Sequence, residues 1–121
     1  MVSGNLLSGT LPNGTAALRS LRHLHLNENP VSGSLPRWLG DEPAYALEHL
    51  HASTTNLSGW LPTELGSLLH VQQLLIDRAS LSGTLPTELG RLGDLATLSL
   101  EWNSLSGTIP LEVSRRPYEL R

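Results

Sequence analysis

Leucines recur at fixed intervals along this chain, and the polar residues between them recur in step. The stretch 95–110, LATLSLEWNSLSGTIP, follows the pattern L-x-x-L-x-L-x-x-N-x-L-S-G-x-I-P. In the equivalent stretch upstream, Leu24 and Leu26 flank the polar His25. This alternation is typical of a strand with one buried face. The pattern therefore predicts a short strand that ends at the asparagine and is followed by a turn.

The second half of this stretch occurs four more times, at 5–12 (NLLSGTLP), 29–36 (NPVSGSLP), 55–62 (TNLSGWLP) and 79–86 (ASLSGTLP). The glycines of the five segments are separated by 24, 26, 24 and 24 residues. A nearly constant period of this length indicates a solenoid, in which each unit covers the hydrophobic face of its neighbour. We expect a stack of similar units.

The S-G-x-L/I-P ending, together with T-E-L-G-x-L at 63–68 and 87–92, resembles the plant-type leucine-rich repeat family. The resemblance implies an α/β-type repeat solenoid, a short right-handed horseshoe fragment with a parallel β-sheet on its concave face. It also implies irregular or 3₁₀ segments on the convex side and, often, a second short strand after the turn. We expect four principal parallel strands around a leucine core.

The repeats predict a leucine-rich repeat domain of about four and a half units at 1–114 and an irregular C-terminal tail at 115–121. Pro117 argues against another in-register unit, because proline has no backbone N–H to donate. The first unit begins inside a strand, which favours a fragment of a longer solenoid over an open edge. Residues 41–46 carry two extra residues, which we expect to form a surface bulge.

An asparagine recurs where each strand ends, and it is replaced in the middle units. It is present as Asn5, Asn29 and Asn103, whereas Thr55 and Ala79 stand at the equivalent positions. An asparagine amide can both donate and accept hydrogen bonds to the turn backbone. A weaker or water-bridged turn is therefore expected at Thr55 and Ala79.

The outward positions of the strands form four columns, because equivalent residues on neighbouring strands lie about 4.8 Å apart. The columns are His23, His49, Gln73 and Thr97; His25, His51, Leu75 and Ser99; Asn27, Ser53, Asp77 and Glu101; and Glu28, Thr54, Arg78 and Trp102. The family resemblance implies that this concave face is the partner-binding surface. All column residues except Ser53, Thr54, Leu75 and Thr97 are candidate partner-binding residues.

Four of the five histidines fall in one square on this surface: His23, His25, His49 and His51. Imidazoles placed together in this way can ligate zinc or copper. They can also make a partner contact pH-sensitive, since clustered imidazoles resist simultaneous protonation. A third alternative is four solvated polar side chains, and the sequence leaves all three open.

Two tryptophans and two glycosylation sequons are further surface candidates. Trp102 is a candidate interface residue, since tryptophan is enriched at binding hot spots, or else a cover for the last strand. Trp60 replaces the Thr or Ser of the other S-G-x-L-P copies, and we expect it to pack on the surface near the bulge or to serve a second interface. Sequons at Asn13 and Asn56 are candidate glycosylation sites, and the second arises whenever Asn precedes the repeated Leu-Ser.

Composition narrows the functional classes. The 121 residues carry a net charge of −3 and contain no Cys, which excludes disulfides and thiolate chemistry and gives no reason to expect nucleic acid or membrane contact. No catalytic motif occurs, so we expect no enzymatic activity. No signal peptide or transmembrane segment is present in the sequence, and an extracellular or cell-surface location is implied by the resemblance alone.

We therefore expect protein or peptide binding through the concave face, within a larger receptor-like or secreted leucine-rich repeat protein. A structural module that self-associates through uncapped ends is the alternative. A metal- or pH-responsive binding module built on the histidine square is a further alternative. No cofactor is expected apart from zinc or copper at that square.

Overall fold

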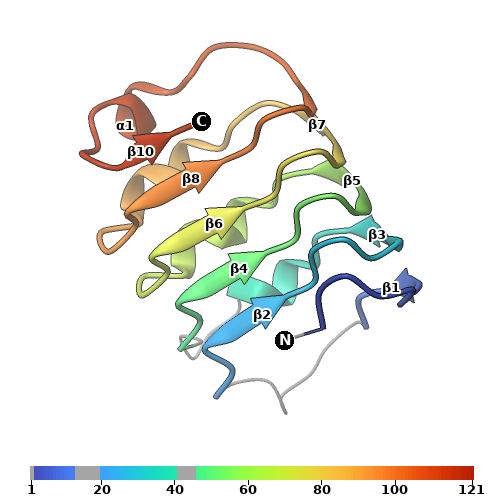
Figure 1. The fold of residues 1–121 in the computed structure, drawn as a ribbon. Coiled ribbons are helices and arrows are strands. Elements are labelled where there is room, and N and C mark those ends of the chain that lie inside the picture. Colours follow the sequence, from blue (N-terminus) through green and yellow to red (C-terminus); the bar gives the residue numbers. More distant parts are fainter. Residues whose placement is uncertain (1, 13–19, 41–45) are drawn as a thin grey trace.

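Two parallel β-sheets and a row of short helices make up the fold in the computed structural model, which describes residues 2–12, 20–40 and 46–121 (Figure 1). The first sheet, called here the main sheet, has the order β10-β8-β6-β4-β2. Its strands are β2 (His23–His25), β4 (His49–His51), β6 (Gln73–Leu75), β8 (Thr97–Ser99) and β10 (Glu119–Leu120).

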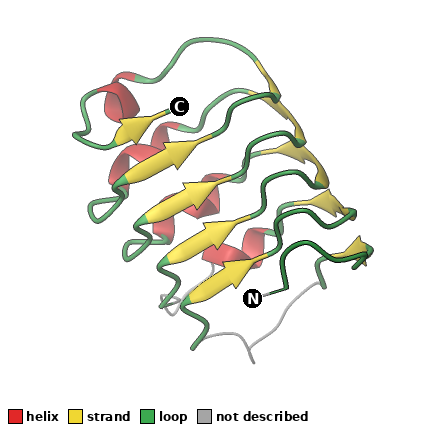
Figure 2. Ribbon diagram, viewed as in Figure 1, coloured by secondary structure: helices red, strands yellow, loops and turns green. Residues whose placement is uncertain are grey.

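The second sheet follows the turn in each repeat and has the order β1-β3-β5-β7-β9. Its strands are β1 (Gly9–Thr10), β3 (Val31–Ser34), β5 (Asn56–Trp60), β7 (Ser80–Gly83) and β9 (Ser104–Leu105). Helical segments then return the chain to the main sheet: the 3₁₀ helices η2 (Arg37–Gly40), η3 (Thr63–Ser67) and η4 (Thr87–Arg91), and the α-helix α1 (Leu111–Ser114) (Figure 2). The leucine-rich repeat solenoid predicted from the sequence is confirmed, and so is its second row of strands.

The leucine skeleton forms one continuous core between the two sheets and the helices. Leu50, Leu74 and Leu98, at the centres of consecutive main-sheet strands, are each 0% exposed. At the N-terminal end of the main sheet, Leu24 occupies the same position but is only half-buried, and it packs against the edge of this core. Leu50, Leu74 and Leu98 are thus covered by strands on both sides, whereas Leu24 lies at the edge of the sheet.

The recurring asparagines join consecutive repeats. Asn103 Nδ2 donates to Ile76 O at 2.7 Å and to Leu100 O at 3.0 Å, while its Oδ1 accepts from Leu81 N–H at 3.0 Å. Ile76 and Leu81 belong to the preceding repeat. Asn29, which is 1% exposed, bonds in the same way to Val2 O and Leu7 N–H. The side chain therefore serves as a bridge between two turns.

Thr55 is too short to make this bridge. Its hydroxyl donates to Ala52 O at 2.9 Å and accepts from Leu57 N–H at 3.5 Å, both within its own repeat. Ala79 has no polar side chain at all. The middle repeats thus depend on their strand ladders and core for stacking.

Glycines in the helical segments set how closely the repeats stack. A Cβ placed on Gly66 would lie 2.5 Å from Glu88 O, and one on Gly90 would lie 2.7 Å from Glu112 O. Contacts this short are sterically forbidden, so only glycine allows the next segment to approach. This close approach explains why the repeated T-E-L-G motif ends in glycine.

The C-terminal tail is not irregular, as the sequence predicted, because 119–120 form β10 beside β8. Pro117 precedes the strand, so its missing N–H is not needed in the ladder. The backbone N–H of Glu119 donates to Ala96 O at 2.9 Å, and that of Arg121 donates to Leu98 O at 2.8 Å. In return, Leu100 N–H donates to Arg121 O. Tyr118 is 9% exposed and anchors the tail to the core. A fifth main-sheet strand results, where four were expected.

Two expectations fall outside the described residues: the bulge at 41–46, of which only Ala46 is described, and the Asn13 sequon. Within the described part of the chain, none of the helices has both the length and the apolar character needed to cross a bilayer.

We expect Gly66→Ala to lower the free energy of unfolding by about 1–3 kcal/mol or more, because the new methyl group collides with the Glu88 backbone. Gly93→Ala is the matched control, since a Cβ there meets nothing within 4 Å. Urea denaturation followed by circular dichroism measures both. Equal stabilities for the two variants would contradict the stacking argument.

We expect Asn103→Ala to destabilise the fold by about 2 kcal/mol, because it leaves the Leu81 N–H and the Ile76 carbonyl without their partner. Asn5 is exposed and, among the described residues, its side chain bonds to Val2 O and Ser3 O of its own turn, so Asn5→Ala should change stability by less than about 0.5 kcal/mol. The same urea titrations test this difference, and a larger loss at Asn5 would refute the bridging role.

Candidate functional site

The strand register places the first two predicted columns side by side on the main sheet. His23 pairs with His49, His49 with Gln73, and Gln73 with Thr97. In the second column His25 pairs with His51, His51 with Leu75, and Leu75 with Ser99. The sequence alignment of the repeats therefore gives the correct register, while a binding role for these residues stays a prediction.

The third column links the repeats through side-chain to backbone hydrogen bonds. Asn27 Oδ1 accepts from Ser53 N–H at 2.8 Å, Ser53 Oγ from Asp77 N–H at 3.1 Å, and Asp77 Oδ1 from Glu101 N–H at 2.8 Å. Asp77 Oδ1 also accepts from Ser99 Oγ at 2.7 Å. Asn27 and Asp77 were predicted only as partner contacts, and the structure gives them a structural role that the sequence pattern did not indicate.

The fourth column adopts left-handed backbone angles without glycine. Glu28, Thr54, Arg78 and Trp102 have φ values of 57°, 57°, 51° and 58°. The backbone N–H groups of Glu28, Thr54 and Arg78 donate to Ser53 O, Asp77 O and Glu101 O of the next repeat, at 2.8–3.0 Å. A left-handed residue other than glycine is uncommon and is held by its surroundings. The ladder therefore fixes the backbone at Glu28, Thr54 and Arg78, and Trp102 continues this row of exposed residues with the same backbone angles.

Trp102 and Arg78 are the most prominent of these exposed side chains. Trp102 is 74% exposed, and Arg78 Cζ lies 5.9 Å from the centre of its ring. A guanidinium at this distance over tryptophan makes a cation–π contact. The two side chains form a rigid aromatic and cationic patch beside Glu101, which is also exposed.

Ser99 does not fit the prediction, because it is 5% exposed and cannot contact a partner freely. Its strand, β8, has β10 alongside it, and its hydroxyl is engaged by Asp77. The unexpected fifth strand therefore removes one residue from the candidate surface.

The four clustered histidines lie together at the N-terminal end of the main sheet. The ring centroids of His25 and His51 are 4.2 Å apart and nearly parallel, and those of His23 and His49 are 4.6 Å apart. His51 Nε2 lies 2.9 Å from Gln73 Oε1, and His23 Nε2 lies 4.0 Å from Glu48 Oε2. The square predicted from the sequence is therefore present.

Two histidines of the square, His25 and His51, lie where a charged imidazole is disfavoured. Burial lowers the pKa of His25, and repulsion from His51, His49 and His23 lowers it further. The pKa of His51 is also lowered, first by burial, against the opposing effect of its hydrogen bond to Gln73. Protonation at these two positions is therefore disfavoured in the folded state.

A surface hollow lies away from the main sheet, between the second sheet and the helical segments. It is lined by residues 34–38 and 60–64, including both Trp38 and Trp60. Trp60 is 75% exposed and packs against Gly83, whereas Trp38 is buried and donates from Nε1 to Pro12 O at 2.7 Å. Asn56, the described sequon, has an exposed side chain on β5.

Comparison with known proteins agrees with this geometry. The model of the Leucine Rich Repeat family matches residues 20–41, and no curated protein sequence matches the chain significantly. Among solved structures, the plant peptide hormone receptor RGFR1 in complex with RGF2 is 32% identical over 92% of this chain, with a TM-score of 0.86. The Arabidopsis receptor kinase HAESA, in complex with the peptide hormone IDA and the co-receptor SERK1, is 36% identical over 93%, with a TM-score of 0.85.

The BIR3–SERK2 complex from Arabidopsis thaliana gives a further match, 36% identical over 94% of this chain with a TM-score of 0.83. The chain spans 18% of the matched RGFR1 and HAESA chains and 60% of the matched chain in the BIR3–SERK2 complex. The fold and register define a leucine-rich repeat solenoid. The chain belongs to the leucine-rich repeat proteins of the plant type, and its similarity is to receptor ectodomains.

The lowered histidine pKa values predict that the fold loses stability in mild acid. An unfolded histidine takes up a proton near pH 6.5, whereas folded His25 and His51 do so only at lower pH. The unfolded chain therefore binds more protons just below pH 6.5, and unfolding becomes easier as pH falls. Arg22 and Glu48 lie beside the square and form an ion pair with each other, with 3.1 Å between Nη1 and Oε1.

Urea denaturation between about pH 7.5 and about pH 5.5 measures this loss. We expect His25→Gln to reduce the pH dependence more than His70→Gln does, because His70 lies outside the square, with its Nδ1 3.4 Å from Asp94 Oδ2. A wild-type chain whose stability is flat or rises toward pH 5.5 would contradict the assignment.

Proposed function

We propose that this chain binds a protein or peptide through the outward face of the main sheet. The observation that carries the proposal is the row of exposed side chains at the strand ends, above all Trp102 with the Arg78 guanidinium 5.9 Å from its ring centre. Backbone bonds between repeats fix the main chain at Glu28, Thr54 and Arg78, and the cation–π contact joins Arg78 to Trp102. Binding to a preorganised surface costs less conformational entropy than binding to a flexible one.

The similar receptors support this choice of partner class. The RGFR1 and HAESA structures are complexes with RGF2 and with the peptide hormone IDA, and the HAESA complex also contains a co-receptor. A peptide or a second leucine-rich repeat protein is therefore the expected partner class for this chain. We propose a binding role rather than a catalytic one, since the acidic residues of this face are engaged in structural hydrogen bonds or exposed.

The composition of the face favours an elongated ligand that crosses the strands. Moving along the stack, a ligand meets imidazoles at the β2 and β4 end, then Gln73 and Arg78, and finally Glu101 and Trp102. The two ends of the surface therefore differ in chemistry, so an elongated ligand can bind in one orientation and not in the reverse. A peptide with an acidic or aromatic residue at one end matches the Arg78 and Trp102 patch.

The proposal predicts that Trp102 is a binding hot spot. Peptides would be selected from a displayed random library on the immobilised chain, and their affinities measured by calorimetry. We expect Trp102→Ala to weaken selected peptides by at least about tenfold, the loss typical of a hot-spot residue. Trp60→Ala is the matched control, because Trp60 is equally exposed but lies on the second sheet.

Peptides that bind Trp102→Ala as well as the wild type, and that are lost on Trp60→Ala, would refute the proposed face. Arg78→Ala provides a second check, since it should weaken the same peptides without removing an apolar side chain. Trp102→Ala and Arg78→Ala alter exposed residues, so circular dichroism should show an unchanged fold for each.

Self-association is a second candidate function, favoured by exposed apolar residues at the two ends of the stack. Leu6 and Leu7 are 90% and 48% exposed beside β1, and Ile109 and Leu111 are 52% and 56% exposed near α1. The occupant proposed for these ends is a second copy of the chain. Light scattering across a concentration series separates the alternatives: a constant monomer mass removes self-association, and a rising mass supports it.

A further inference from the structure

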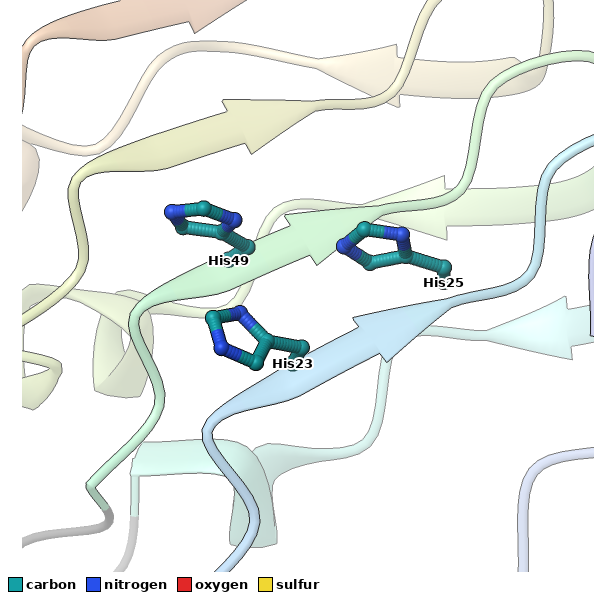
Figure 3. Close-up of side chains that lie close together, drawn as sticks. All are labelled: His23, His25 and His49. Atoms are coloured by element: carbon teal, nitrogen blue, oxygen red, sulfur yellow. The ribbon is translucent and has the colours of Figure 1, made fainter. Parts of the chain in front are cut away.

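Three imidazoles converge on one space above neighbouring strands of the main sheet. One nitrogen from each of His23, His25 and His49 lies within 4.8 Å of the others. Figure 3 shows the three rings on the same side of β2 and β4, with His49 and His25 on either side of the space that His23 faces. The strand register sets this arrangement, because His23 and His49 are directly paired.

The spacing is close to that of a bound divalent ion. Zinc binds imidazole nitrogen at about 2.0–2.1 Å, which places the nitrogens of a tetrahedral site about 3.4 Å apart. The three rings therefore need shifts on the order of 1 Å, which small rotations about the side-chain bonds provide. The backbone of β2 and β4 does not have to move.

Neighbouring side chains are placed to orient the rings. Glu48 Oε2 lies 4.0 Å from His23 Nε2, and Arg22 Nη1 holds the other carboxylate oxygen at 3.1 Å. A carboxylate on the second ring nitrogen is the usual support of a metal-binding histidine. The repeat pattern did not indicate this carboxylate, since Glu48 precedes its strand and belongs to none of the four columns.

His51 occupies the fourth corner but has another role. Its Nε2 is already hydrogen-bonded to Gln73, and its ring lies flat against His25 at 4.2 Å. This contact fixes the plane of the His25 ring. His51 is therefore a positioning residue, and the square of four candidate ligands from the sequence is reduced to three.

One ring nitrogen of His25 lacks a hydrogen-bond partner among the described residues, and a bound metal ion can take that place. This nitrogen, Nε2, is buried. A buried polar atom without a partner is costly, and native proteins rarely leave one so. A metal ion bound at this nitrogen supplies the missing partner.

We propose that His23, His25 and His49 form a binding site for a divalent transition-metal ion, with zinc as the best match. The three ligands come from one face of the sheet, so the fourth coordination position is open toward the outside. Imidazole nitrogen suits zinc and copper among the available ions. The site shares the outward face of the main sheet with the peptide-binding proposal, but its test uses zinc alone and needs no peptide.

The test is a zinc titration by calorimetry of the whole chain, expressed without a histidine tag and stripped of metal with a chelator. We expect one zinc ion per chain with a dissociation constant on the order of 1 µM or tighter at about pH 7.5. His23→Gln, His25→Gln and His49→Gln should each weaken binding by at least about a hundredfold, because the loss of a supporting residue alone costs about 10–100-fold. His70→Gln is the matched control and should bind as the wild type does.

A second readout separates lost binding from lost folding. Zinc should raise the melting temperature of the wild type and of His70→Gln, and should not raise that of the three ligand variants, whose metal-free melting curves show that they are folded. Three results would overturn the proposal: no zinc binding at micromolar concentrations, equal affinity in the wild type and ligand variants, or a weakening by His70→Gln as large as theirs.

Discussion

No single repeat of this chain can bury its own leucines, and that constraint governs the rest of the structure. Leu50, Leu74 and Leu98 are fully buried only because a repeat lies on each side. Close stacking requires glycine in the helical segments, where Gly66 and Gly90 leave room for the next backbone. It also requires in-register strands, so that each N–H finds a carbonyl in the neighbouring unit. The same register then decides which side chains meet on the outward face.

Much of the fold could be predicted because the same sequence motif recurs in each repeat. The spacing of the glycines gave the period, and the leucine pattern gave the strands, so the pairing of His23 with His49 followed from alignment alone. The tail could not be predicted in this way. It lacks the repeated motif, and its strand depends on Tyr118 packing into the core and on hydrogen bonds to Ala96 and Leu98, which are contacts distant in sequence.

The candidate surface, like the fold, could be predicted only in part. Periodicity identified which residues point outward, but it could not show which of them are already engaged. Asp77 bonds to the next repeat, Ser99 is covered beside β10, and His51 is held by Gln73. Glu48 was missed because it precedes its strand, so only its side-chain position brings it to His23. Left-handed angles at Glu28, Thr54, Arg78 and Trp102 were missed because none of them is glycine.

The central claim is that the repeats stack in the register that unites these side chains, and nuclear magnetic resonance tests it most directly. A one-residue slip between strands would turn every side chain to the opposite face. Nuclear Overhauser contacts between backbone protons of neighbouring strands are predicted to join His23 with His49, His49 with Gln73, and Gln73 with Thr97. Contacts offset by one residue along these strands would contradict the account.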